Sequence, residues 1–320
     1  MKLSDFYKKA LSTGIDNDPR GKDLVIKELE RRKKDYENLK PKEKETFDME
    51  SLENPYSDSR ILHGTGDEDI KAILVGIDIE VGEVLLSETL KNRNIPVDLI
   101  VSHHPEGRAY ANLYSVMYMQ SDILNRFGVP INIAEDLMEG RIKEVERKLM
   151  PVNHTRAVDA AKLLNMPFAC LHTPADNMVA SYLQKTFDDK KPYTVDDVID
   201  LLREMPEYKE GEKNNAGPKI LLGSKSRKAG RIFVDMTGGT EGSKEIFQSL
   251  SLSGINTIVA MHLSEEHRKE AEKNHVNVVI AGHIASDNLG LNFLLDRTTE
   301  NEEIKILECS GFRRVKRNAL

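Results

Sequence analysis

The sequence predicts an α/β protein whose mainly parallel strands are flanked by helices. Apolar runs rich in Ile and Val alternate with stretches of helical character, and each run leads into a loop of small or polar residues. Continuous apolar runs indicate strands that are covered on both faces, as they are in parallel sheets. Alternation of such strands with helices is typical of the α/β class.

The length of 320 residues exceeds that of most single domains and favours two lobes. The first 69 residues are dense in Lys and Glu and show no strand pattern, so we expect a helical N-terminal extension there. We expect a first α/β lobe over residues 70–185 and a second α/β lobe over residues 186–320.

The strands and helices are predicted in order along the chain. KAILVGIDI, which starts at Lys71, is a buried strand, a helix follows over residues 82–93, and PVDLIVS is the second strand of a β-α-β unit. Residues 135–165 are expected to form two inserted helices, and residues 186–217 one helix flanked by charged loops. The other predicted strands are GVPINIAE, FACLHTPAD, RIFVDMTGGTEGS, NTIVAMHLS and VNVVIAGHIASD.

Composition narrows the class of protein. Hydrophobic residues at 39%, charged residues at 31% and a net charge of −7 fit a soluble globular protein, and the acidic balance argues against nucleic acid as the main partner. The start, MKLSDFYKKA, mixes charges into its apolar residues, so no secretory signal is expected, and no apolar run is long enough to cross a membrane. Only Cys170 and Cys309 are present, which excludes a Cys-based zinc site and favours a cytoplasmic location.

Histidine occurs at three predicted strand ends, where ligands collect in open α/β sheets. The three stretches are SHHP with His103 and His104, HTPAD with His172 and Asp176, and GHIASD with His283 and Asp287. Side chains four residues apart lie on one face of a helix, so each His-x-x-x-Asp pair can chelate one ion. Adjacent histidines in a loop can point at two different ions, which predicts a two-metal site with a bridging carboxylate.

The donor types indicate which ions such a site prefers. Imidazoles with carboxylates suit zinc, iron, manganese, cobalt or nickel better than magnesium or calcium. A single histidine at a strand end is more often a hydrogen-bonded residue than a metal ligand. We assign the other five histidines to that ordinary class: His63, His154, His262, His267 and His275.

Two further stretches have both a functional and an ordinary interpretation. MTGGTEGS, residues 236–243, leaves a strand, and its glycines can expose backbone N–H groups to a phosphate. A glycine-rich turn with Thr240 as a helix cap is the favoured interpretation. The C-terminal SGFRRVKRNAL is basic and can touch phosphate, but a solvated or intersubunit end is the favoured interpretation.

DLIVSHHPEG, LHTPAD and VIAGHIASD, in that order, resemble the three motifs of the NIF-three-like (NGG-one-interacting factor three) family. Bacterial members of that family are known as type 2 GTP cyclohydrolase I homologues. The resemblance covers roughly residues 71–296 and implies a two-lobed fold, with the metal site in a cleft at the strand carboxyl ends. It also implies a centre of two divalent transition-metal ions and ring-shaped homo-oligomers, often hexamers. The residues that match the family's metal ligands are His103, His104, Asp176, His283 and Asp287.

The resemblance extends to roles and also shows departures. His172 matches a histidine that is a metal ligand or the partner that orients one. The family usually has Glu where this chain has Asp287, and we would expect an apolar residue where this chain has Glu106. The chain is therefore expected to lie in a divergent branch of the family.

The leading hypothesis for function is a metal-dependent hydrolase that acts on a small molecule, either a nucleotide or another phosphoester. GTP ring opening is implied by the resemblance alone. Asp176 would bridge the ions, His172 would orient a ligand or donate a proton, and Glu106 would be an outer base. The alternative is a regulatory, scaffold or metal-carrier protein without enzymatic activity, because a structural site closes the coordination positions that a catalytic site leaves open.

Overall fold

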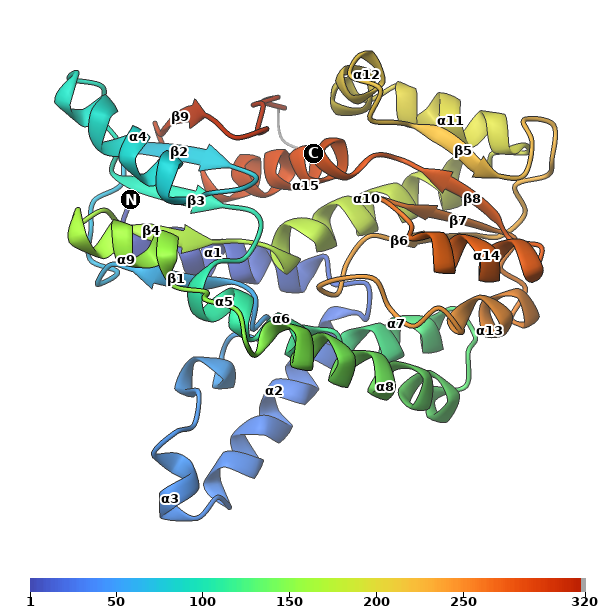
Figure 1. Cartoon of the computed structure of the whole chain (residues 1–320), viewed down its shortest axis with the longest axis horizontal. Helices are drawn as coiled ribbons and strands as arrows, with labels where there is room; N and C mark the ends of the chain where they lie inside the picture. The colour runs from blue at the N-terminus through green and yellow to red at the C-terminus, as the bar shows by residue number, and fades with distance from the viewer. Residues whose placement is uncertain (318–320) are drawn as a thin grey trace.

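The computed structural model describes residues 1–317 and contains two β-sheets surrounded by helices (Figure 1). Both sheets are mainly parallel, because only β1 and β5 run antiparallel to their neighbours. The predicted α/β class is therefore confirmed. The first sheet has the order β1 (Arg60–His63), β4 (Phe168–Cys170), β3 (Leu99–Ser102), β2 (Ala72–Gly76), β9 (Lys305–Glu308). The second sheet has the order β5 (Lys219–Leu222), β8 (Asn277–Ile280), β7 (Thr257–Ala260), β6 (Ile232–Asp235).

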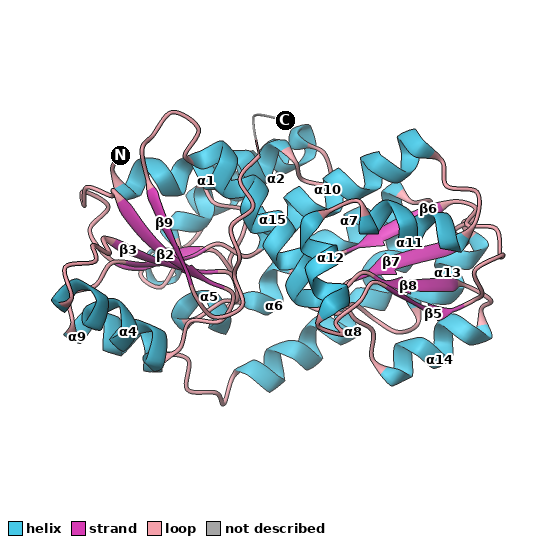
Figure 2. Cartoon of the chain, turned by 90° about the horizontal axis from the view of Figure 1, so that it is seen from above, coloured by secondary structure: helices cyan, strands magenta, loops and turns pink. Residues whose placement is uncertain are grey.

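Helices cover the sheets and connect them (Figure 2). A 3₁₀ helix at Met49–Leu52 follows an arm, made of α2 and α3, that projects from the rest of the chain in Figure 1. The helices of the first half of the chain are α1 (Leu3–Asp16), α2 (Lys22–Glu37), α3 (Pro41–Lys44), α4 (Val81–Asn92), α5 (Gly107–Ala111), α6 (Leu113–Val116), α7 (Met119–Arg126), α8 (Ile131–Leu149) and α9 (Arg156–Leu163). Those of the second half are α10 (Thr173–Lys190), α11 (Val195–Arg203), α12 (Pro206–Lys213), α13 (Ile246–Leu252), α14 (Glu265–Lys273) and α15 (His283–Thr298).

The three central strands of the first sheet, β2, β3 and β4, are buried on both faces, as their apolar sequences predict. Leu74, Ile100 and Phe168 belong to a small core with residues of α4 and α9. Their strand neighbours, among them Ile73 and Val101, belong to the main core with residues of α1, α10 and α15. Successive side chains of a strand point to opposite faces, so each strand contributes to both cores.

Helices α10 and α15 pack against each other and against α1, and they lie between the two sheets (Figure 1). Gly290 of α15 sits directly on the backbone of α10, where a Cβ atom would lie 2.4 Å from the carbonyl oxygen of Ala175. The absence of a side chain at Gly290 therefore sets how closely the two helices approach. Asp176 and Asp287 lie beside this crossing, one on each helix.

Replacing Gly290 by Ala is expected to lower the free energy of unfolding by about 1–3 kcal/mol, because a backbone atom must move to admit the methyl group. Thermal unfolding in the absence of metal measures the change. Gly140→Ala in α8 is a matched control, since a Cβ there meets no atom within 4 Å. The control is expected to be neutral or to stabilise by about 0.5–1 kcal/mol. Equal stability of the two variants would contradict the tight crossing.

Three short strands were not recognised from the sequence, and all three lie at sheet edges. They are β1, β5 and β9, and each pairs on one side only. Strands β5 and β9 are partly exposed along their length, so neither shows a continuous apolar run. The expectation that residues 1–69 contain no strand is wrong at β1. Strand β9 lies near the end of the chain, and it joins the first sheet by pairing with β2.

Two other predictions of local structure are wrong. GVPINIAE is not a strand, because α8 begins at Ile131 directly after Pro130. The buried positions Ala134, Met138 and Ile142 recur at helical spacing, while Ile131 itself is exposed. Residues 186–217 contain two helices, α11 and α12, in addition to the end of α10. The two inserted helices expected over residues 135–165 are found as α8 and α9.

Candidate metal centre

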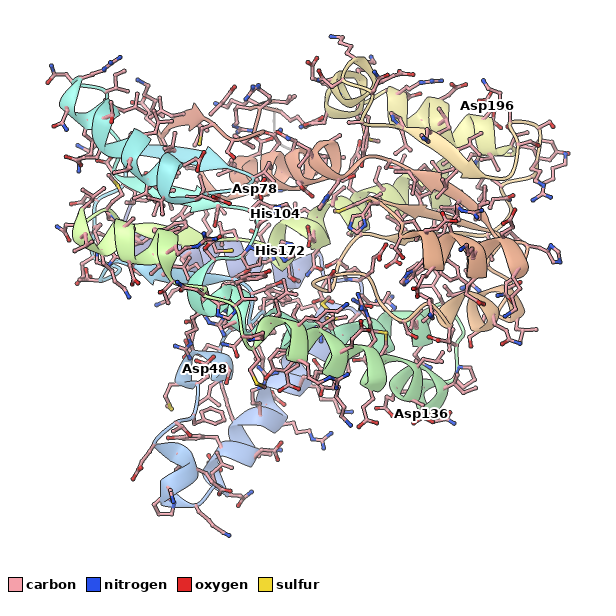
Figure 3. All side chains as sticks on the ribbon, viewed as in Figure 1. Asp48, Asp78, His104, Asp136, His172 and Asp196 are labelled. Carbon is pink, nitrogen blue, oxygen red and sulfur yellow. The ribbon has the colours of Figure 1, made fainter. Side chains whose placement is uncertain are left out.

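The carboxyl ends of parallel strands from both sheets meet in one cleft. Strand β3 leads into His103 and His104, and β4 leads into His172, which precedes the first residue of α10. Strand β8 leads into His283, the first residue of α15. Figure 3 shows His104, His172 and Asp78 gathered between the two sheets. The cleft has a volume of about 710 Å³, and its lining includes His104, His172, Asp176, His283, Asp287 and Glu106.

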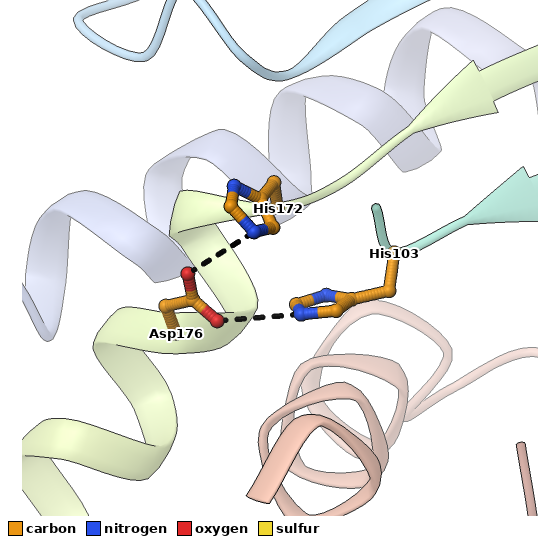
Figure 4. A group of neighbouring side chains, drawn as sticks. All are labelled: His103, His172 and Asp176. Atoms are coloured by element: carbon orange, nitrogen blue, oxygen red, sulfur yellow. Dashed lines mark ion pairs between the residues drawn. The ribbon is translucent and has the colours of Figure 1, made fainter. Parts of the chain in front are cut away.

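Two groups of side chains that share His103 can hold a metal ion. The first is His103 with His172 and Asp176, and the second is His103 with His104 and Asp287. Within each group the nitrogen and oxygen atoms all lie within 4.8 Å of one another. In the first group, Asp176 places one oxygen 3.4 Å from His103 Nε2 and the other 3.6 Å from His172 Nε2 (Figure 4).

Asp287 occupies a central position in the second group. Its Oδ1 lies 3.4 Å from His103 Nε2, and its Oδ2 lies 3.5 Å from His104 Nε2. The same Oδ2 lies 3.7 Å from His283 Nε2, one helical turn earlier in α15. Asp287 is almost fully buried, so its two oxygens face different histidines in a space that water barely reaches.

The histidines turn Nε2 toward this space because oxygen atoms hold Nδ1 on the other side of each ring. His172 Nδ1 lies 2.8 Å from Asp58 Oδ2, and His104 Nδ1 lies 2.7 Å from Asp78 Oδ1. His103 Nδ1 lies 3.3 Å from the carbonyl oxygen of Leu171. An oxygen of this kind only accepts, so Nδ1 carries the proton and a neutral ring presents a lone pair at Nε2.

A divalent cation between them would satisfy imidazole and carboxylate lone pairs that face one another. The buried atoms His103 Nε2, Asp176 Oδ1 and both carboxylate oxygens of Asp287 make no hydrogen bond to any residue in 1–317. Buried polar atoms without partners are costly and uncommon in folded proteins. The donor set therefore fits a divalent metal ion.

Comparison with known proteins agrees with the fold and with the motifs. No protein-family model matches the sequence, and no curated protein does. Among solved structures, a NIF3 superfamily protein from Sphaerobacter thermophilus is similar at 25% identity and a TM-score of 0.69, over 80% of this chain and 91% of that chain. The chain has a NIF3-like fold, and this similarity supports a divergent NIF3-like family member. Reduced HcgD from Methanocaldococcus jannaschii shares the fold at 13% identity and a TM-score of 0.50, over 84% of this chain and 97% of that chain.

The NIF3-like cleft is also lined by residues that follow strands of the second sheet and that the sequence analysis did not select, among them His262 and Glu241. His262 follows β7, and its Nδ1 lies 3.4 Å from Glu241 Oε1. The ring centroids of His262 and His283 lie 4.9 Å apart. His262 therefore adds a further imidazole, carried by the second sheet, beside the candidate metal centre. Burial would raise the pKa of Glu241, but His262 and His267 lower it to about 2. His262 was assigned to the ordinary class, although its place after an apolar strand was a usable signal.

Glu106 lies at the mouth of the same cleft and belongs to neither group of donors. It is half-buried and precedes the short helix α5. Burial and the nearby Glu80 raise its pKa to about 7. A carboxyl group with such a pKa exchanges protons readily near neutral pH.

Asp58 and Asp78 were also missed by the sequence analysis, for different reasons. Asp78 follows β2 directly, and the end of that predicted strand was a signal that could have found it. Asp58 precedes β1, an edge strand that the sequence does not reveal. Burial would raise the pKa of Asp58, but hydrogen bonds from His172 and Thr173 hold it below its ordinary value.

The glycine-rich stretch after β6 is a turn anchored on a helix. The side-chain amide of Gln120 in α7 donates to the carbonyl oxygens of Gly238 and Thr240, at 2.6 and 2.8 Å. Gly238 has a φ of +98°, which favours glycine. The glycine-rich turn is confirmed, but Thr240 does not cap a helix, because α13 begins only at Ile246.

Two of the four basic residues of the C-terminal segment, Arg314 and Arg317, form ion pairs within the chain. Arg314 contacts Asp296, and Arg317 Nη2 lies 2.6 Å from Glu207 Oε2. Among residues 1–317, no helix is both long enough and apolar enough to span a bilayer.

Proposed function

We propose that the chain holds two divalent transition-metal ions in the cleft and hydrolyses a phosphoester, with nucleotides as the expected substrate class. The convergence of His103 Nε2 with oxygens of Asp176 and Asp287 carries the proposal. These atoms are buried, and none of them has a hydrogen-bond partner in the described part of the chain. The proposed ligands are His103, His104, Asp176, His283 and Asp287, with His172 beside them.

The contacts divide these ligands between two ions. His103, Asp176 and His172 would serve one ion, and His104 with His283 would serve the other. We assign the bridging role to Asp287, because its Oδ1 faces His103 of the first proposed ion and its Oδ2 faces His104 and His283 of the second. The sequence favoured Asp176 as the bridge, but its two oxygens face His103 and His172, which this division assigns to the same ion.

Two divalent ions lower the pKa of water toward neutrality and offset the negative charge that develops on a phosphoryl oxygen. The residues of the chain would orient the substrate around them. Arg141, Lys148 and Arg156 line the cleft and provide positive charge for the anionic part of a phosphoester. Glu106, on the same lining, would accept a proton from the attacking water.

Metal analysis of the purified protein, followed by a screen for phosphatase, phosphodiesterase and nucleotide-hydrolase activity, tests this function. Manganese, zinc, iron, cobalt and nickel are supplied in turn. We expect close to two ions per chain and a turnover that chelation abolishes. Bound metal without turnover on any substrate would support the regulatory, scaffold or carrier alternative. A chain that binds none of these ions would overturn the proposal.

We also propose that copies of the chain assemble, as a hexameric ring in the manner that the resemblance implies. The packed helices α4 and α9 expose Leu85, Leu86 and Leu163, the last of which is 88% exposed. Exposed apolar area of this kind favours contact with a partner. Light scattering at micromolar concentration that reports a monomer would contradict it. The free thiols of Cys170 and Cys309 support a cytoplasmic location.

A further inference from the structure

Asp58 is a buried carboxylate in the segment before β1. It lies on the Nδ1 side of His172, away from the candidate metal centre. Its Oδ2 accepts a hydrogen bond from His172 Nδ1 at 2.8 Å and another from Thr173 Oγ1 at 2.6 Å. The next residue, Ser59, accepts the backbone N–H of His172 through Oγ at 3.0 Å. Asp58 and Thr173 are fully buried, so solvent does not compete for these contacts.

We propose that Asp58 is a positioning residue of the metal centre: it fixes the Nδ1–H tautomer of His172 and thereby aims the Nε2 lone pair at the ion held with Asp176. The inference rests on the proposed function, because it concerns the same ion. A carboxylate on the remote nitrogen of a metal-bound imidazole fixes its orientation and increases its basicity. The distance of 3.6 Å from His172 Nε2 to Asp176 Oδ2 leaves the two lone pairs facing each other.

Asp58 can fix His172 because its own segment is held firmly. The buried guanidinium of Arg60 donates to the carbonyl oxygens of Tyr56 and Ser59, at 2.7 and 2.8 Å. The hydroxyl of Tyr7 in α1 donates to the same carbonyl oxygen of Ser59 at 2.6 Å. Residues 1–69 were expected to be a helical N-terminal extension, and these contacts make the end of that segment part of the support for His172.

The role of Asp58 differs from that of a buried residue that only stabilises the fold. A purely structural carboxylate would affect unfolding but leave the tautomer of His172 and the affinity for metal unchanged. Removing the carboxylate frees His172 to protonate Nε2, which then cannot donate a lone pair. Thr173 offers a matched control, because Thr173→Val removes a hydrogen bond to the same oxygen and leaves the contact with His172 in place.

Calorimetric titration of the full chain with Zn²⁺ or Mn²⁺ alone tests the proposal. Asp58→Ala and Asp58→Asn are expected to weaken one of the two ions by about 10–100-fold, the usual effect of losing such a partner. Thr173→Val is expected to remain within about threefold of the parent, since it touches no metal-facing atom. Circular dichroism without metal confirms that each variant is folded.

Nitrogen NMR of the metal-free protein provides a readout that is independent of metal and of activity. We expect the His172 ring to be protonated at Nδ1 in the parent and in Thr173→Val, and to shift toward the Nε2–H tautomer in Asp58→Ala. If the parent binds both ions and Asp58→Ala binds them equally well, the proposed role of Asp58 is wrong. The proposed function then still stands. A parent that binds neither ion would overturn both.

Discussion

Replacing His103 by Ala is expected to abolish binding of one ion and to weaken the other strongly. His103 belongs to both groups of donors, and its Nε2 contacts the two carboxylates that the proposed ions require. We expect a loss of affinity beyond about 100-fold, since even an outer partner of a ligand is worth 10–100-fold. Calorimetric titration with Zn²⁺ or Mn²⁺ measures it, and hydrolysis should fall in parallel.

Two further variants separate this loss from unfolding. His275→Asn removes an exposed imidazole after α14 at a backbone position with φ of +59°, which Asn tolerates, and should bind metal like the parent. His103→Gln keeps a polar side chain between Asp176 and Asp287 if His103→Ala is poorly folded. The fold itself should survive without metal, because a chain of this size buries a sufficient core. Unchanged binding in both His103 variants would exclude His103 as a ligand.

The positions of the histidines in the candidate metal centre were predictable because central strands have a clear sequence pattern. The run PVDLIVS has to be covered on both faces, and β3 is buried at all four of its residues. The same holds for β7 before His262 and nearly so for β8 before His283. The carboxyl ends of neighbouring parallel strands converge, so a histidine after such a run is placed near the others before any contact is known.

The residues that hold Nδ1 of those histidines were harder to predict. An edge strand pairs on one side only and is partly exposed, so its sequence shows no continuous apolar run. Strand β1 has one buried residue followed by three that are partly exposed, so nothing in YSDSRILH announces a strand. Asp58 therefore looks like a turn residue, and its contact with His172 spans 114 positions of the chain. The division of roles between Asp176 and Asp287 likewise depends on how closely α10 and α15 cross at Gly290.

Asp287→Asn is expected to weaken both ions, by at least about 10-fold for the ion near His283, because it removes the negative charge from a carboxylate whose Oδ1 faces His103 and whose Oδ2 faces His283. Asp287→Glu is expected to retain or tighten binding. The motif that this stretch resembles usually has Glu at this position, and Asp287 lines the cleft, so the longer side chain is expected to reach the same histidines. Zn²⁺ or Mn²⁺ titration of the three proteins decides the stoichiometry and the affinity of each ion.

The pair of variants distinguishes a metal ligand from a residue that stabilises the start of a helix. Asp287 is the fifth residue of α15 and lies beyond the first turn, where the helix-dipole effect is concentrated, so Asn is expected to lose little stability through that effect. A dipole effect leaves metal stoichiometry unchanged. His283→Ala should weaken the ion that depends on Asp287 Oδ2, because its Nε2 faces the same oxygen. Parent-like binding of both ions by Asp287→Asn would leave His283 as the only ligand in the third motif and would remove the proposed bridge between the two ions.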